Sequence, residues 1–81
     1  ESFLKFRNRI NKALGKILAQ EKGTIVIISH AGVNRVIICN LLKLPLSYFW
    51  QIKQNIGAIN IIEIYNNSNV ISLINYALWE N

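Results

Sequence analysis

A run of β-branched residues that stops abruptly at the start of a helical pattern constrains the fold most. Residues 24–28, Thr-Ile-Val-Ile-Ile, show no polar alternation, which is typical of a parallel strand covered on both faces. The sequence Ser29-His30-Ala31-Gly32 follows, and apolar spacing then predicts a helix from near Val33 to Leu42. The only histidine of the chain is therefore expected where a buried strand ends and a helix begins. Open α/β sheets bind ligands in this crevice, and the N–H groups of a helix N-terminus favour an anion there.

The rest of the sequence predicts another amphipathic helix, a short helix and a hairpin. Apolar residues at helical spacing predict a helix from about Ser2 to Gln20, with Ser2 as its N-cap. A short helix is expected over residues 46–51, directly after Pro45. Two β-rich runs, 58–65 and 70–76, flank four turn-forming residues and predict a hairpin. This order fits an α/β sheet with an antiparallel pair at one edge.

Length and composition favour one incomplete domain. The chain has 81 residues, of which 52% are apolar, more than so small a body needs for its core. Together with a first residue that is Glu rather than Met, this surplus predicts a fragment whose sheet or helices need partners. We therefore expect an oligomer or a complementing chain. Phe49, Trp50 and Trp79 are expected to cover apolar faces.

Charge and cysteine content bound the partners and the compartment. The net charge is +5, and most basic residues of the N-terminal part are expected on the solvated face of its helix. A nucleic-acid partner is disfavoured, because Phe3 and Phe6 belong to the apolar stripe and do not alternate with the basic residues. No apolar run approaches the roughly 18 residues of a membrane span. A single cysteine, Cys39, expected to be buried, excludes an internal disulfide and predicts a cytoplasmic protein.

Several stretches resemble one known family. The sequence Ser29-His30-Ala31-Gly32-Val33, with Arg35 two positions on, is similar to the second histidine motif of the histidine phosphatase superfamily. This group includes phosphoglycerate mutases and α-ribazole-phosphatase-like enzymes. Other parts of these proteins are resembled, in chain order, by Glu1-Ser2 with Phe6 and Arg9, by 41–46 followed by Phe49-Trp50, and by 54–63. The likeness covers essentially the whole chain.

The resemblance implies a fold and its position within that fold. Residues 1–81 would be a single partial domain, the C-terminal part of a three-layer α/β/α domain with a mostly parallel sheet and an antiparallel edge hairpin. The N-terminal portion of the family's domain, which carries an Arg-His-Gly motif, is absent from this sequence. The α-ribazole-phosphatase-like branch is favoured, because the mutases typically have Gly-Asn where Ala31-Gly32-Val33 stands here.

The resemblance also implies a phosphomonoesterase site. In the family, the histidine of Arg-His-Gly attacks phosphorus, arginines and a second histidine bind the phosphoryl oxygens, and a glutamate protonates the departing alkoxide. His30 matches the second histidine and Glu1 the acid, so these are the predicted catalytic residues. The substrate would be a small phosphorylated metabolite, with no cofactor and no metal. The nucleophilic histidine is missing, so the chain by itself is expected to be inactive.

Each predicted site residue also has a purely structural interpretation. His30 and the backbone N–H of Ala31 are expected to bind phosphate, whereas a carbonyl-paired histidine and a tight turn are the alternatives. Glu1 fits a helix N-terminal acid as well as a proton donor. Arg35 and Asn55 are possible pocket residues, but an ion pair or surface position and a turn explain them equally well.

A second function from a different class stays open. A basic, Ile-rich half-domain without catalytic activity would bind a partner protein or an acidic polymer. Chain length and the missing nucleophile favour this alternative as a description of this polypeptide, if not of its ancestor, whereas a piece of a phosphomonoesterase is the favoured hypothesis. The salt dependence of DNA binding discriminates between the two functions.

Overall fold

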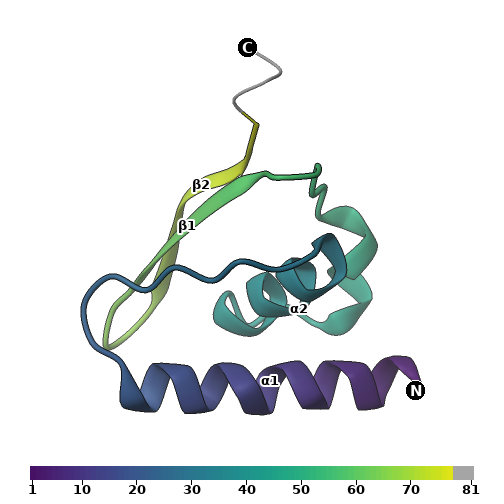
Figure 1. Ribbon diagram of the computed structural model, residues 1–81, viewed down its shortest axis with the longest axis horizontal. Helices are drawn as coiled ribbons and strands as arrows, with labels where there is room; N and C mark the ends of the chain where they lie inside the picture. The colour runs from purple at the N-terminus through teal and green to yellow at the C-terminus, as the bar shows by residue number, and fades with distance from the viewer. Residues whose placement is uncertain (78–81) are drawn as a thin grey trace.

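The computed structural model describes residues 1–77, which form a layer of helices and a β-hairpin (Figure 1). The elements are α1 (Phe3–Gln20), α2 (Ala31–Leu41), the 3-10 helix η1 (Leu46–Gln51), β1 (Ile59–Ile64) and β2 (Asn69–Tyr76). This confirms a mixed α/β chain. The sheet of the described residues contains β1 and β2, and neither a parallel pair nor a three-layer arrangement is seen in them.

Helix α1 begins where the sequence predicts. Ser2 has extended backbone, and its hydroxyl accepts a hydrogen bond from the N–H of Lys5 at 3.1 Å, which confirms it as the N-cap. The helix buries Ile10 and Leu14 and exposes its charged residues other than Arg7, which is half-buried. No helix within residues 1–77 has both the length and the apolar character needed to cross a membrane.

The core lies around α2 and has two parts. Ile10, Val36 and Phe49 form one buried cluster, so α1, α2 and η1 meet there. Ile38, Cys39 and Ile52 form the other, with Ile62 of the hairpin packed against it. Cys39 and Phe49 are buried as predicted, but Trp50 is 78% exposed. Trp79 lies outside the described residues.

The hairpin and the turns before it confirm the predictions for the second half of the chain. Strands β1 and β2 are antiparallel, with Ile62 opposite Ile71 and Glu63 opposite Val70. The register shifts between Ile59 and Ile62, where the ladder is irregular. Pro45 directly precedes η1, as expected.

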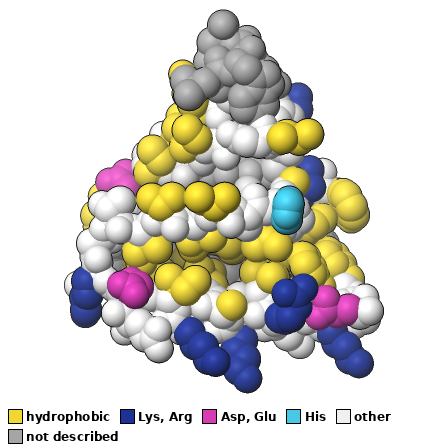
Figure 2. Space-filling view, in the orientation of Figure 1, with side chains coloured by type: hydrophobic (Ala, Val, Ile, Leu, Met, Phe, Trp, Pro, Cys, Tyr) yellow, Lys and Arg dark blue, Asp and Glu magenta, His cyan; other side chains and the backbone are white. Residues whose placement is uncertain are grey.

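The prediction of a strand at residues 24–28 is wrong. The segment between α1 and α2 has no strand pairing, and its side chains are not covered on both faces: Val26 is 79% and Ile28 93% exposed. Figure 2 shows hydrophobic side chains exposed on the surface of the molecule, in the orientation of Figure 1. The physical reason is the lack of a backbone partner within residues 1–77, because β1 and β2 pair with each other. Residues 24–28 belong to no helix or strand, and we call them the unpaired segment.

Candidate functional site

A pocket of about 120 Å³ opens where the unpaired segment meets α2. One wall comes from the start of α2, and the other from the loop that leads into β1. The wall residues are Ser29, His30, Ala31 and Asn34 on the first side, and Asn55, Ile56, Gly57 and Ala58 on the second. On the same measure of volume, a cavity needs roughly 10–15 Å³ to hold one water molecule. The pocket therefore has room for a small polyatomic ligand.

The first wall is the N-terminus of α2, where no acidic side chain of the first turn neutralises the helix dipole. His30 is the N-cap of α2, with extended backbone (φ −92°, ψ 167°), and its carbonyl accepts the N–H of Asn34 at 2.9 Å. The N–H groups of the first turn precede that bond and have no partner within the helix. The first turn carries no acidic residue. An anion in the pocket would meet both these N–H groups and the positive end of the helix dipole.

His30 is exposed at this wall, and within residues 1–77 its ring is available to bind a ligand. Within residues 1–77, no side-chain hydrogen bond or ion pair involves its imidazole, and it makes no capping bond. Figure 2 shows the histidine, in cyan, on the surface of the molecule. An imidazole in this position can donate an N–H to a ligand in the pocket without first breaking an internal contact.

The second wall is a tight turn. The N–H of Ala58 donates to the carbonyl of Asn55 at 3.2 Å, and Gly57 lies between them with φ 70°. Glycine suits this place because positive φ costs it little. The turn keeps Asn55 at the pocket, where the sequence had placed it as a possible lining residue.

Glu1 lies elsewhere, at the start of α1. Its carboxylate forms a two-point ion pair with Arg9, at 3.0 Å from Nε and 3.1 Å from Nη2. The hydrogen bond from Arg9 lowers the pKa of Glu1. A general acid needs a pKa near the working pH, so this arrangement favours the carboxylate rather than the proton donor. The acid role of Glu1 stays a prediction.

Arg35 also lies outside the pocket lining, but it holds the chain that leads to the second wall. Its Nε donates to the carbonyl of Ile52 at 2.6 Å. The guanidinium lies 5.5 Å from the ring centre of Phe49 and 5.9 Å from that of Trp50. These contacts tie α2 to the end of η1. Arg35 therefore touches neither the pocket nor an ion-pair partner in the described residues.

The sequence interpretation missed several polar residues near the pocket. Asn34 and Ser29 line it, and the hydroxyl of Ser29 donates to the side-chain oxygen of Asn34. Behind them lies the buried amide of Gln54, which pairs with Asn60 of β1. One signal was available: asparagine is depleted in strands, yet one stands inside each Ile-rich run of the hairpin, Asn60 and Asn75.

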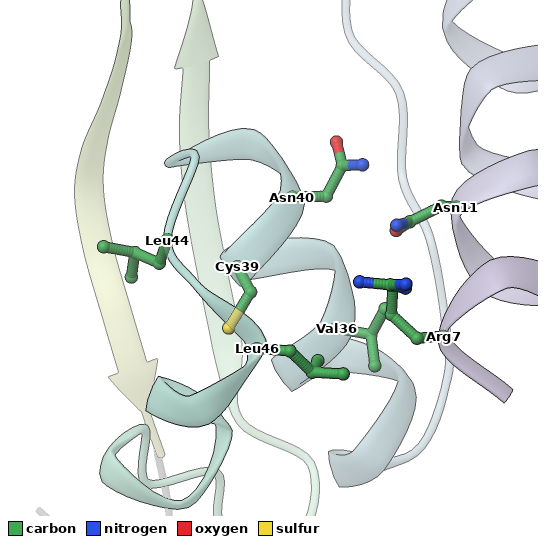
Figure 3. A pocket seen from close by; sticks show the side chains of 7 residues that line it. All are labelled: Arg7, Asn11, Val36, Cys39, Asn40, Leu44 and Leu46. Carbon is green, nitrogen blue, oxygen red and sulfur yellow. The ribbon is translucent and has the colours of Figure 1, made fainter. Parts of the chain in front are cut away.

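A second, smaller pocket of about 60 Å³ lies between α1 and α2 (Figure 3). Arg7 and Asn11 reach into it from α1, over an apolar floor that includes Val36 and Cys39 of α2. Burial raises the pKa of the Cys39 thiol, which disfavours the reactive thiolate. Among the described residues, no group of three His, Cys, Asp or Glu side chains is placed to hold a metal ion.

Comparison with known proteins identifies the family. Residues 1–77 match the family model of the histidine phosphatase superfamily (branch 1). A search of curated proteins and a search of solved structures gave no match. The family match spans nearly all of the 81 residues and includes the helix start that carries His30. The chain belongs to the histidine phosphatase superfamily.

Proposed function

We propose that this chain provides the oxyanion-binding part of a phosphomonoesterase site that acts on a small phosphorylated metabolite. One observation carries the proposal: an uncommitted imidazole, His30, stands at a pocket beside the free N–H groups of α2. His30 and the N–H of Ala31 would bind the phosphoryl oxygens. A phosphoryl group in transfer carries negative charge on its equatorial oxygens, so fixed donors aimed at them lower the barrier.

The covalent step needs a group that this sequence does not contain. His30 is the only histidine and no Arg-His-Gly occurs. The family resemblance implies a phosphohistidine intermediate, which divides hydrolysis into two easier displacements. In our proposal a segment outside these 81 residues supplies that nucleophile. Glu1 would first leave Arg9 and take up a proton from solvent, and would then transfer this proton to the leaving oxygen.

The finer assignments follow the same resemblance. We assign the chain to the α-ribazole-phosphatase-like branch and to the C-terminal part of a three-layer α/β/α domain in the cytoplasm. The exposed apolar side chains of Val26 and Ile28 support a missing sheet partner. A complementing segment, in the same or another polypeptide, would supply that partner together with the nucleophile.

Anion titration of the 81-residue chain tests the proposal. Inorganic phosphate or vanadate should shift the ring resonances of His30 in NMR spectra. The His30→Ala variant should lose the phosphate-dependent shifts of the Ala31 and Gly32 amides, whereas Lys22→Ala, an exposed cation outside the pocket, should keep them. Absence of any phosphate effect in the unmodified chain would refute the proposal.

Reconstitution tests the catalytic part. An Arg-His-Gly-containing N-terminal portion from a superfamily member should restore hydrolysis of p-nitrophenyl phosphate when combined with this chain. His30→Ala should abolish that turnover, because the oxyanion would lose a fixed donor. Full turnover by the reconstituted His30→Ala variant would exclude the assigned role.

One observation favours a noncatalytic alternative. The basic side chains of Lys5, Arg9, Lys12 and Lys16 are exposed and spaced along one face of α1. Such a stripe can attract an acidic polymer. Tight binding of duplex DNA with a steep loss of affinity at higher salt, and no response to phosphate at His30, would support this alternative.

A further inference from the structure

Gln54 is the buried polar residue that connects the two walls of the pocket. Its exposed fraction is 7%, and no other polar residue among residues 1–77 is as fully buried. It lies next to Asn55 of the second wall and faces Asn34 of the first. A buried amide without partners would destabilise the chain, so Gln54 requires hydrogen-bond partners inside the fold.

Every polar site of the Gln54 amide is used. Its nitrogen donates to the carbonyl of Lys53 at 2.9 Å and to Oδ1 of Asn60 at 2.8 Å. Its oxygen accepts from Nδ2 of Asn60 at 2.7 Å and from Nδ2 of Asn34 at 3.5 Å. Gln54 and Asn60 thus form a reciprocal amide pair. An amide with both donors and both acceptors occupied has one preferred orientation.

The hydrogen bonds continue from Asn60 to the second wall. Oδ1 of Asn60 also accepts the backbone N–H of Asn75 at 2.9 Å, and Oδ1 of Asn75 accepts the backbone N–H of Asn55 at 2.7 Å. Asn75 has φ 54°, a left-handed conformation that asparagine tolerates better than most residues. The backbone of Asn55 is therefore held by a side chain from β2, twenty residues away in sequence.

The same hydrogen bonds reach the first wall in the other direction. Asn34 donates to Gln54 and accepts from the hydroxyl of Ser29, which precedes the N-cap His30. This series of hydrogen bonds therefore begins at the Ser29 side chain and ends at the backbone N–H of Asn55, both at the pocket. We call it the amide belt, and its members are Ser29, Asn34, Gln54, Asn60, Asn75 and Asn55.

We propose that Gln54 is a positioning residue, which holds the two walls at the separation that a phosphate-sized oxyanion requires. This inference rests on the proposed function, because it concerns the same pocket. Donors bind an oxyanion well only when they are fixed in place, and loss of supporting hydrogen bonds loosens them. The belt explains why an Ile-rich hairpin carries two inward asparagines: they support the pocket from behind.

Phosphate affinity of Gln54→Leu in the 81-residue chain is the first test. The substitution keeps the approximate volume but removes four hydrogen bonds. We expect the Kd for inorganic phosphate, measured from the NMR shifts of the His30 ring, to rise roughly tenfold, the lower end of the loss seen when residues that support metal ligands are removed. Gln51→Leu, the same change at an exposed position of η1, should leave the Kd unchanged.

Asn75→Gly tests the belt without touching Gln54. Glycine keeps the left-handed backbone and removes only the acceptor for the N–H of Asn55. The Kd for phosphate should again rise, with the folded state retained in circular dichroism and thermal melts. This variant keeps the inference testable even if Gln54→Leu does not fold.

Gln54→Glu separates positioning from a merely structural role. An ionised carboxylate cannot donate to the carbonyl of Lys53 or to Asn60, but a protonated one restores one donor. The ratio of its phosphate Kd to that of the unmodified chain should therefore fall as the pH is lowered from neutral to acidic. A general loss of stability would not produce such a profile.

The outcomes separate the inference from the function it rests on. Phosphate binding by the unmodified chain, with unchanged Kd in folded Gln54→Leu and Asn75→Gly variants, overturns the role of Gln54 and leaves the proposed function standing. No phosphate binding by the unmodified chain overturns both. Weaker binding in both variants and normal binding in Gln51→Leu supports the inference.

Discussion

Two Ile-rich runs of similar composition end in different structures. Ile59–Ile64 forms β1 and pairs with β2, whereas the Thr-Ile-Val-Ile-Ile run at 24–28 stays an unpaired segment. Both have the β-branched side chains that favour extended backbone. The difference teaches that side-chain preference sets local conformation, but a strand is a property of two backbones. Only β1 has a partner within reach of a short turn.

The hairpin also makes packing and hydrogen-bond contacts with the helices. The unpaired segment makes fewer such contacts. Ile62 packs on the buried cluster around Ile38, and Nδ2 of Asn69 donates to the carbonyl of Leu41 at 2.7 Å, at the end of α2. The unpaired segment leads into α2 through Ser29, but Val26 and Ile28 remain in solvent. Anchoring, as well as pairing, therefore distinguishes the two runs.

Hydrogen exchange should show the largest difference between the runs. The amides of residues 25–28 lack ladder partners among the described residues, so they should exchange close to the rate of an unfolded chain. The hydrogen-bonded amides of β1 and β2 should exchange about a hundredfold more slowly than the amides of residues 25–28, because their exchange requires opening of the hairpin. NMR-detected exchange measures both in one sample. Equal protection would show that residues 25–28 are paired in solution and would break the comparison.

A matched pair of truncations should show the next largest effect. Ile62→Ala removes contacts with the core and should lower the free energy of unfolding by about 2 kcal/mol. Ile28→Ala removes a side chain that is 93% exposed and should change it by less than about 0.5 kcal/mol. Urea denaturation followed by circular dichroism measures the two values. An equal loss in both variants would contradict the structure.

The link between the hairpin and α2 should contribute less. Asn69→Ala removes the hydrogen bond to Leu41 and should cost about 1 kcal/mol of unfolding free energy. Asn67→Ala, at an exposed position of the same turn region, is the control and should be neutral. The same urea experiment applies. A neutral Asn69→Ala would mean that packing alone holds the hairpin on the helices.

The smallest effect concerns a surface pair at the end of β1. The hydroxyl of Tyr65 donates to Oε1 of Glu63 at 2.7 Å, and this hydrogen bond, with a second from Ser72, lowers the pKa of Glu63. Because the folded pKa lies below the unfolded one, the stabilisation is complete above the unfolded pKa and is lost as the pH falls through the folded pKa. Tyr65→Phe should raise the Glu63 pKa towards its ordinary value in an NMR titration, and Tyr48→Phe should not. An unchanged pKa in Tyr65→Phe would exclude the pair in solution.

The sequence predicted those elements whose cause is local. The apolar stripe of α1, the cap at Ser2 and the turn between β1 and β2 depend on neighbouring residues, and all three are confirmed. His30 was expected at a helix start and is the N-cap of α2. The prediction of a strand at 24–28 was wrong because a strand needs a second backbone to pair with, and no neighbouring part of the sequence provides one.

The remaining part of the candidate site depends on contacts between distant residues. Periodicity carries no information on which amide faces which, so the pairing of Gln54 with Asn60 and the bond from Asn75 to Asn55 were not predicted. Arg35 was expected at a possible pocket, in an ion pair or at a surface position, but its guanidinium donates to the carbonyl of Ile52. Side chains with several donors choose among partners that only the folded chain brings together.

The hydrogen bond from Arg35 to the carbonyl of Ile52 makes both walls of the pocket depend on α2. Helix α2 forms one wall of the pocket and, through this guanidinium, holds the segment that leads to the other wall. Helix α1 lends no residue to that cavity. The exposed charges of α1 can therefore change, and with them the partners that this helix attracts, without any change in the residues that line the pocket.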